Sequence, residues 1–319
     1  DLVTADRSGR IVVWPKRMPQ TMLVSTIPME REYSVGTPMC WKDHETLLRC
    51  QPNGFIEVNV RTGAHRVAAE FMVDSPVTCC VFDSNHHHLI WGNGRGELVV
   101  CNEDGRQIKL FALSPDAAIR NLSIDKAGSK VVVRTGTSKV YLVDPSSGRV
   151  LEHAGGAESA LITSDGRWVC LGRWLMPPYF QICDSKTLAA VFTETRPEFG
   201  QEFAALTDDG RHYVSRCFDG SLRVWSCPDG EVVGQMSTGI SRSHQLAIHP
   251  DCRTLATLDE RSKNFTLWDL VTGSEVLVGG SHSRATRSVS FSPGGRYFAS
   301  VDRSGDIYVD DSLAEIKFR

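Results

Sequence analysis

Three consecutive histidines, His86-His87-His88, are the first residues in this sequence whose types suggest chemistry, because imidazole nitrogens bind transition metals. On a strand, His86 and His88 would share one face while His87 would point away from it. No carboxylate or third ligand lies in phase nearby. We therefore favour a solvated turn over a metal site, and we predict neither a metal nor another cofactor.

The cysteines are a second candidate for metal binding or for disulfides. The 319 residues include 10 cysteines, but no Cys-x-x-Cys and no Cys/His pair with zinc-finger spacing. Six of the cysteines fall among Val, Leu and Phe on expected strands: Cys79, Cys80, Cys101, Cys170, Cys183 and Cys217. We interpret them as buried thiols of a protein in a reducing compartment, the cytoplasm.

The segment Arg173–Tyr179, with the sequence RWLMPPY, is the most unusual loop of the chain. Corresponding turns elsewhere are polar, for example Asp302-Arg303-Ser304. A large apolar loop among polar counterparts indicates either a contact site or a cap that folds back over its own sheet. The predicted contact residues are of the kinds that dominate interface energies, namely Arg173, Trp174, Met176 and Tyr179.

Five arginines occupy turns that the repeating unit described below would place on or near the same face as this loop: Arg7, Arg95, Arg242, Arg261 and Arg303. Such a rim would suit an acidic or phosphorylated peptide. Acidic residues are interleaved with it, namely Glu194, Glu198, Glu202, Asp259 and Glu260. A charged, solvated face without a partner is the favoured interpretation, and the basic rim is the alternative.

The elements that must position these residues are short strands in a repeating unit. The clearest copy is Arg287–Asp311, in which Pro293-Gly294-Gly295 and Asp302–Gly305 separate three strands. The fourth residue of the first turn recurs 38 to 44 residues apart, at His44, His86, Gly128, Gly166, Gly210, Cys252 and Gly295. A period of this length, built of four short strands, is typical of a β-propeller blade.

The residues of three units resemble the WD40-repeat family. The resemblance is carried by Phe291–Gly295, Ser221–Trp225 and Asn264–Asp269, and it extends over nearly the whole chain. Only one Trp-Asp dipeptide occurs, Trp268-Asp269. The resemblance implies an all-β propeller of four-stranded antiparallel blades that binds proteins or peptides.

We expect one propeller domain over residues 1–319, with units at about 1–27, 37–71, 76–112, 118–153, 158–192, 201–236, 243–278 and 286–319. Thr21–Ile27 and Ala314–Phe318 are the expected outer strands of the first and last units. Eight blades are favoured, the first lacking its inner strand, and seven blades are the alternative. Because the chain opens at Asp1 within a motif, we expect it to be a piece of a longer polypeptide.

The resemblance also implies hydrogen-bond sets that link strands within a blade. Carried over by position, they are His282, Ser300 and Asp302; Thr257, Asp259 and Trp268; and Ser215, Asp219 and Trp225. A Ser-His-Asp trio is also the composition of a catalytic triad, but no Ser lies on a G-x-S-x-G elbow. We therefore predict structural hydrogen bonds and no catalytic residues.

Composition restricts the remaining function classes. A net charge of −3, from 35 basic and 38 acidic residues, provides no footprint for nucleic acid, and no apolar run approaches a membrane span. The leading hypothesis is a non-catalytic scaffold module that binds a protein or peptide. The alternative is a sensor or regulatory propeller of a larger signalling protein, such as a bacterial serine/threonine kinase. A propeller hydrolase with a channel metal is the least favoured class.

Overall fold

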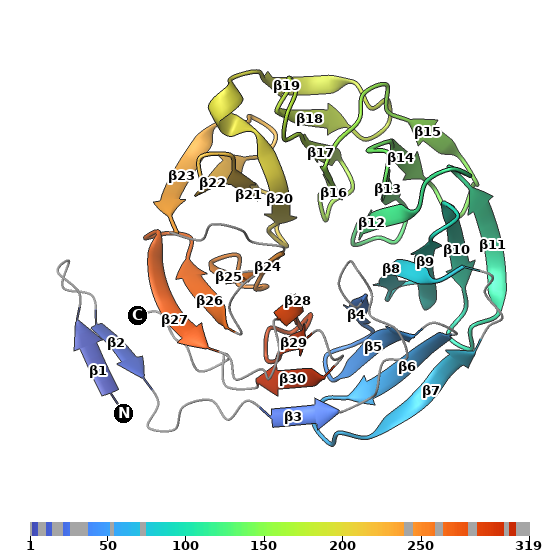
Figure 1. Cartoon of the computed structure of the whole chain (residues 1–319), viewed down its shortest axis with the longest axis horizontal. Helices are drawn as coiled ribbons and strands as arrows, with labels where there is room; N and C mark the ends of the chain where they lie inside the picture. The colour runs from blue at the N-terminus through green and yellow to red at the C-terminus, as the bar shows by residue number, and fades with distance from the viewer. Residues whose placement is uncertain are drawn as a thin grey trace.

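Seven four-stranded antiparallel sheets stand side by side in a ring around a central opening (Figure 1). The structure is a computed structural model, and it describes residues 2–5, 11–14, 22–25, 38–51, 54–70, 75–238, 245–258, 264–279, 286–302 and 306–310. Consecutive segments of the chain form consecutive sheets, which we number as blades 1 to 7. In each blade the first strand lies innermost, so the blades are those of a β-propeller.

The strands of the first four blades follow the chain in order. Blade 1 comprises β4 (Met39–Trp41), β5 (Thr46–Gln51), β6 (Gly54–Asn59) and β7 (His65–Glu70). Blade 2 comprises β8 (Val77–Asp83), β9 (His88–Asn93), β10 (Glu97–Cys101) and β11 (Gln107–Ala112). Blade 3 comprises β12 (Ile119–Ile124), β13 (Val131–Thr135), β14 (Val140–Val143) and β15 (Val150–Glu152). Blade 4 comprises β16 (Ser159–Ile162), β17 (Trp168–Gly172), β18 (Phe180–Asp184) and β19 (Ala190–Glu194).

The last three blades complete the ring. Blade 5 comprises β20 (Gln201–Leu206), β21 (His212–Cys217), β22 (Ser221–Ser226) and β23 (Val232–Ser237). Blade 6 comprises β24 (Leu246–Ile248), β25 (Thr254–Leu258), β26 (Phe265–Asp269) and β27 (Ser274–Gly279). Blade 7 comprises β28 (Thr286–Phe291), β29 (Phe298–Asp302), β30 (Ile307–Asp310) and β3 (Met22–Ser25).

The fourth strand of blade 7 comes from the opposite end of the sequence. β3 pairs antiparallel with β30, with Met22 opposite Val309 and Leu23 opposite Tyr308 (Figure 1). The favoured prediction of eight blades was therefore wrong, and the alternative of seven is confirmed. The sequence interpretation assigned Thr21–Ile27 to the first unit. In the structure β3 belongs to the last blade instead, because it pairs with the backbone N–H and C=O groups that the edge of β30 would otherwise leave unpaired. Ala314–Phe318, the predicted outer strand, lies outside the described residues.

Three further elements complete the described chain. β1 (Leu2–Ala5) and β2 (Ile11–Trp14) pair as a separate two-stranded sheet. A single 3₁₀ turn, η1 (Pro197–Phe199), connects blades 4 and 5. No helix in the described part of the chain is long and apolar enough to cross a membrane.

The turn between the first and second strands explains the repeat that is visible in the sequence. Its fourth residue has a positive φ in Gly128 (69°), Gly166 (68°), Gly210 (68°) and Gly295 (72°). In blade 6 the same place is taken by Cys252, at φ 58°. Glycine recurs there because a residue without Cβ adopts this left-handed conformation readily.

The hydrophobic core is divided into seven clusters among the described residues, one in each gap between neighbouring blades. The gap between blades 3 and 4, for instance, holds Val132, Leu142, Ile162 and Val169. The gap between blades 7 and 1 holds Trp41, Leu47, Ala299 and Val309, so the ring is closed by packing as well as by β3. Each blade therefore buries both of its faces against its neighbours.

Two faces of the ring carry the connections. We call the upper face the one with the turns between second and third strands and the connections from blade to blade. We call the lower face the one with the turns between first and second strands and between third and fourth strands. Residues far apart in the sequence meet on these faces, and the site described next lies on the upper one.

Candidate functional site

Exposed apolar side chains from two adjacent blades gather on the upper face. Leu175 and Met176, in the turn between β17 and β18 of blade 4, are 73% and 70% exposed. Phe218, in the turn between β21 and β22 of blade 5, is 61% exposed. The half-buried Trp174 joins the two turns, because its ring centroid lies 5.2 Å from that of Phe218. We call Trp174, Leu175, Met176 and Phe218 the apolar ledge.

Hydrogen bonds fix the loop that carries the ledge. The Arg173 backbone N–H donates to Tyr179 O at 2.8 Å, and the Trp174 N–H donates to Glu158 Oε2 at 3.0 Å. The Arg173 guanidinium donates to the carbonyls of Gly156 and Pro178. The loop is therefore held at both ends, and Arg173 links it to the connection between blades 3 and 4.

The electrostatics of Arg173 do not alter this supporting role. Burial lowers the pKa of Arg173, and the neighbouring Glu158 opposes that effect. An arginine remains protonated despite such a shift, so its N–H groups stay available as donors.

Tyr179 does not belong to the ledge. It is 9% exposed, its backbone N–H donates to Glu194 O at 2.8 Å, and it follows Pro178 directly into β18. The loop therefore combines the two alternatives drawn from the sequence. Its ends fold inward as a cap, and its tip presents Leu175 and Met176 to solvent.

Phe218 is a ledge residue that the sequence interpretation missed. In the repeat, Cys217-Phe218-Asp219-Gly220 corresponds to Asp302-Arg303-Ser304-Gly305, so a phenylalanine stands where the other unit has an arginine. That exchange was the available signal. The Phe218 backbone N–H donates to Gly200 O at 2.7 Å, and this bond fixes the turn against the connection between blades 4 and 5.

Charged groups line a groove of about 520 Å³ between the outer strands of blades 4 and 5. The guanidiniums of Arg196 and Arg223 lie 4.4 and 4.6 Å from the Phe199 ring centroid. Each also meets a carboxylate, Arg196 with Glu194 at 2.6 Å and Arg223 with Asp219 at 2.5 Å. These pairs are mutually satisfied, and the Arg223–Asp219 pair borders the ledge because Asp219 directly follows Phe218.

The predicted arginine rim is only partly described. Arg95 is exposed in the turn between β9 and β10, on the upper face of blade 2, whereas the ledge spans blades 4 and 5. Arg7, Arg242, Arg261 and Arg303 lie outside the described residues, as do His282 and Asp259. The described structure therefore does not bring Arg95 to the ledge.

The predicted strand-linking sets have the following geometry. Trp225 Nε1 donates to Ser215 Oγ at 2.9 Å, and Trp268 Nε1 donates to Thr257 Oγ1 at 3.0 Å. Asp219 takes no part in the Trp225 bond, because it accepts from Ser221 in its own exposed turn. In blade 7, Ser300 and Asp302 are buried, and Asp302 Oδ1 accepts the Asp306 N–H at 3.2 Å.

The histidine triplet lies in the lower-face turn of blade 2 and at the start of β9. His86 Nδ1 lies 2.7 Å from Asp83 Oδ2, and His87 Nδ1 lies 2.6 Å from Glu103 Oε1. Each of these imidazoles is thus paired with a carboxylate of its own blade. No group of three or more His, Cys, Asp or Glu side chains among the described residues could hold a metal ion.

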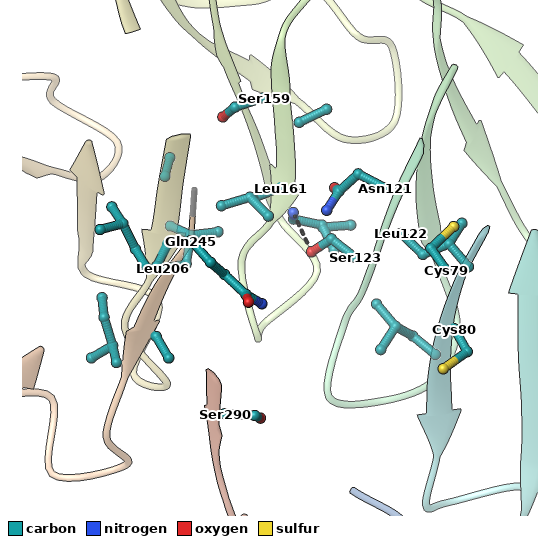
Figure 2. Close-up of a pocket in the computed structure, with 18 of the residues that line it drawn as sticks. Cys79, Cys80, Asn121, Leu122, Ser123, Ser159, Leu161, Leu206, Gln245 and Ser290 are labelled. Carbon is teal, nitrogen blue, oxygen red and sulfur yellow. Dashed lines mark hydrogen bonds between the residues drawn. The ribbon is translucent and has the colours of Figure 1, made fainter. Parts of the chain in front are cut away.

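The central channel encloses about 960 Å³ and is lined by the innermost strands. Figure 2 shows that Asn121 and Gln245 point into the opening. Several of its polar groups connect adjacent blades: Ser123 Oγ accepts the Ile162 N–H at 3.1 Å, and Gln245 Oε1 accepts the Val289 N–H at 3.0 Å. These hydrogen bonds tie blade 3 to blade 4 and blade 6 to blade 7.

Comparison with known proteins identifies the fold. No protein-family model matches the chain, and no curated protein matches it in sequence. A chain in the crystal structure of a mitotic checkpoint complex superposes with a TM-score of 0.74 at 15% identity, covering 94% of this chain and 99% of that one. The β-propeller domain of Myceliophteria thermophila Cps50 (Swd1) superposes with a TM-score of 0.75 at 12% identity, covering 86% and 96%.

The likeness concerns the fold and not a particular activity. In all, 1854 solved chains match this structure, so the architecture alone does not select a function. The Trp-to-Ser and Trp-to-Thr hydrogen bonds occur in the blades whose sequences most resemble WD40 repeats. The chain therefore has a seven-bladed β-propeller fold of the WD40 type.

Proposed function

We propose that this propeller is a non-catalytic scaffold module that docks a segment of a partner protein on the apolar ledge. The observation that carries the proposal is that Leu175, Met176 and Phe218 are all strongly exposed on two turns of adjacent blades, which the contact of Trp174 with Phe218 joins. Exposed apolar patches with a polar border are typical of protein interaction sites. The domain extent over residues 1–319 and the absence of a channel reaction belong to the same proposal.

The backbone of the ledge supports binding without a large ordering cost. The N–H groups of Trp174 and Phe218 are both hydrogen-bonded, and the Arg173 guanidinium donates to two carbonyls. A preformed surface loses little conformational entropy when a partner binds. Burying one such apolar side chain is worth about 1.5–3 kcal/mol.

The test is quantitative capture of partners from a lysate with wild-type protein and with a Met176→Ser, Phe218→Ser double variant. We expect the double variant to lose its specific partner by at least about thirtyfold in affinity. The matched control is Val271→Ser, because Val271 is equally exposed, at 74%, but lies on the lower face in the turn between β26 and β27. Equal recovery of every partner by wild type and the double variant would overturn the proposal.

A sensor or regulatory propeller within a larger signalling protein is the second candidate. The same ledge would then dock a kinase domain or its substrate. The full open reading frame tests this candidate: a catalytic domain encoded in frame supports it, and a reading frame limited to the propeller removes it.

The proposal assigns the protein to the cytoplasm, with protein or peptide ligands and neither nucleic acid nor membrane as a partner. All ten cysteines are thiols, and Cys40 and Cys80 lie with their sulfur atoms only 3.6 Å apart. Thiols this close are expected to persist in a reducing compartment. Fractionation of cells that express the tagged protein is the corresponding measurement.

A further inference from the structure

The two mouths of the central channel differ in how their charged groups are used. At the lower mouth, Asp83 accepts from the backbone N–H groups of Asn85 and His86. Asp125 likewise accepts from Ser129 and Lys130. These carboxylates hold their own turns together. At the upper mouth, two arginines line the channel without comparable partners.

Arg134 is the better buried of the two. It lies on β13, and its backbone is paired with that of Asn121 on β12. Its Nε–H is buried and meets no acceptor among the described residues, and its Nη1 makes only a 3.4 Å contact with Thr135 O. A buried donor without an acceptor costs about 1–3 kcal/mol, so a ligand oxygen at this place would be stabilising.

Arg120 and Asn121 lie at the same level of the channel. Arg120 occupies the register shift between Ile119 and Asn121, it is exposed, and its side chain has no hydrogen bond or ion pair within the described part of the chain. Asn121 points into the opening, and its Oδ1 is likewise buried without a partner there (Figure 2). A half-turn of this amide would direct its NH₂ group to the same point.

Charge favours an anion at this mouth. Glu158 is the one carboxylate that lines the channel there among the described residues, and it already accepts the Trp174 N–H. It forms no ion pair within 4 Å with either arginine in the described structure. Burial lowers the pKa of Arg134, Glu158 opposes this, and Arg120 adds to it, which indicates that the two guanidiniums repel each other.

We propose that the upper mouth of the channel binds a phosphate-class oxyanion, either inorganic phosphate or a phosphate monoester, between Arg120 and Arg134. The planar guanidinium fork matches two oxygens of a phosphate, and Nε–H together with an Nη–H of Arg134 provides that fork. Asn121 supplies a neutral donor. The site is separate from the apolar ledge, so it does not depend on the proposed docking function.

The experiment titrates the whole chain at low ionic strength with inorganic phosphate, O-phosphoserine and acetate, by calorimetry and by NMR of the arginine Nε–H signals. We expect saturable binding of inorganic phosphate that shifts the Arg134 Nε–H signal, and weaker binding of acetate. If the natural ligand is a monoester, O-phosphoserine binds more tightly than inorganic phosphate; if it is the free ion, the order is reversed.

Three variants define the site. Arg134→Gln and Arg120→Gln should each weaken phosphate binding by about tenfold, the loss of one charge-assisted interaction. Lys126→Gln, which removes one positive charge at the lower mouth of the same channel, should change it less than about twofold. Arg120 is exposed, so its variant remains informative even if Arg134→Gln does not fold.

Three results would overturn the proposal. They are no saturable binding by wild type, equal losses in Arg120→Gln and Lys126→Gln, or acetate binding as tightly as phosphate. The Met176→Ser, Phe218→Ser variant should bind phosphate like wild type. A failure of the ledge hypothesis and a failure of the anion site are therefore distinguishable.

Discussion

The lower-face turns of blades 3 and 6 differ from the upper-face surface of blades 3 to 5 in what their side chains contact. On the lower face, turn residues are consumed by the turns themselves: Asp269 accepts from Arg253, Val271 and Thr272, and Asp125 accepts from Ser129 and Lys130. On the upper face, Leu175, Met176 and Phe218 face solvent, and Arg134 keeps a buried donor without a described acceptor. The difference teaches that these lower-face carboxylates stabilise the ring, whereas these upper-face side chains remain available for ligands.

The largest expected effect breaks a lower-face turn. Asp269 is fully buried and accepts Arg253 Nε and Nη2 at 2.9 Å each, so Asp269→Ala leaves several donors unsatisfied. We expect a loss of about 3 kcal/mol in the free energy of unfolding, measured in urea. Asp269→Asn, which keeps acceptor capacity, should lose less. An Asp269→Ala protein as stable as wild type would contradict the contrast between the faces.

A pH titration should act on the same face. Burial alone would raise the pKa of the Asp251 carboxyl. Hydrogen bonds from the His249 ring and from the backbone N–H groups of Arg253 and Thr254 outweigh burial and lower the pKa from 3.8 to about 2. Its stabilisation is present above pH 4 and is lost as the pH falls from about 4 to 2. Because Asp251 is 35% exposed, screening reduces the effect to about 1 kcal/mol.

His249 should show the opposite sign. Burial alone would lower its pKa, but Asp251 and the Gly295 carbonyl outweigh burial and raise it above 6.5. The stabilisation is therefore complete below pH 6.5 and is lost as the pH rises through the folded-state value. Urea unfolding of wild type and Asp251→Asn across pH 2 to 8 measures both the loss of stability at low pH and the loss at higher pH. Identical profiles for the two proteins would contradict this assignment.

A smaller and stabilising change tests the turn geometry. Cys252 holds φ 58° where four other blades have glycine, so Cys252→Gly should raise the free energy of unfolding by about 1 kcal/mol. Gly210→Ala at the corresponding turn of blade 5 should lower it by a similar amount. A destabilised Cys252→Gly would show that the thiol packs too well to be replaced.

The smallest expected effect concerns the ledge. Met176→Ser should leave the unfolding free energy within about 0.5 kcal/mol of wild type, because the side chain is 70% exposed. It should at the same time reduce binding of a hydrophobic dye. A loss above about 1 kcal/mol would mean that the tip of the loop is part of the cap, and the two faces would then differ less than we infer.

Local features of the fold were predictable from the sequence, and its closure was not. The period follows from turns that need a left-handed residue, such as Gly166 and Gly210, and from strands such as Val131–Thr135. The partner of Met22–Ser25 is a strand at the far end of the chain, and no local pattern specifies it. The choice between seven and eight blades depended on that one pairing.

The site was predictable in part for a similar reason. The Arg173–Tyr179 loop differs in composition from its counterparts, so it could be singled out. The inward turn of Tyr179 depends on its backbone bond to Glu194, and the contact of Trp174 with Phe218 joins two blades. Both depend on tertiary packing, which a repeat alignment does not contain.

The pairing of β3 with β30 also affects how the protein folds during synthesis. During synthesis, Met22 leaves the ribosome long before Val309, the residue it must meet, has been polymerised. β3 therefore stays unpaired while blades 1 to 6 are synthesised, and the ring can close only after β30 has been synthesised. Nascent chains released before residue 310 should therefore be open arcs that are sensitive to proteases, and the arrival of a few last residues should convert them to a resistant ring.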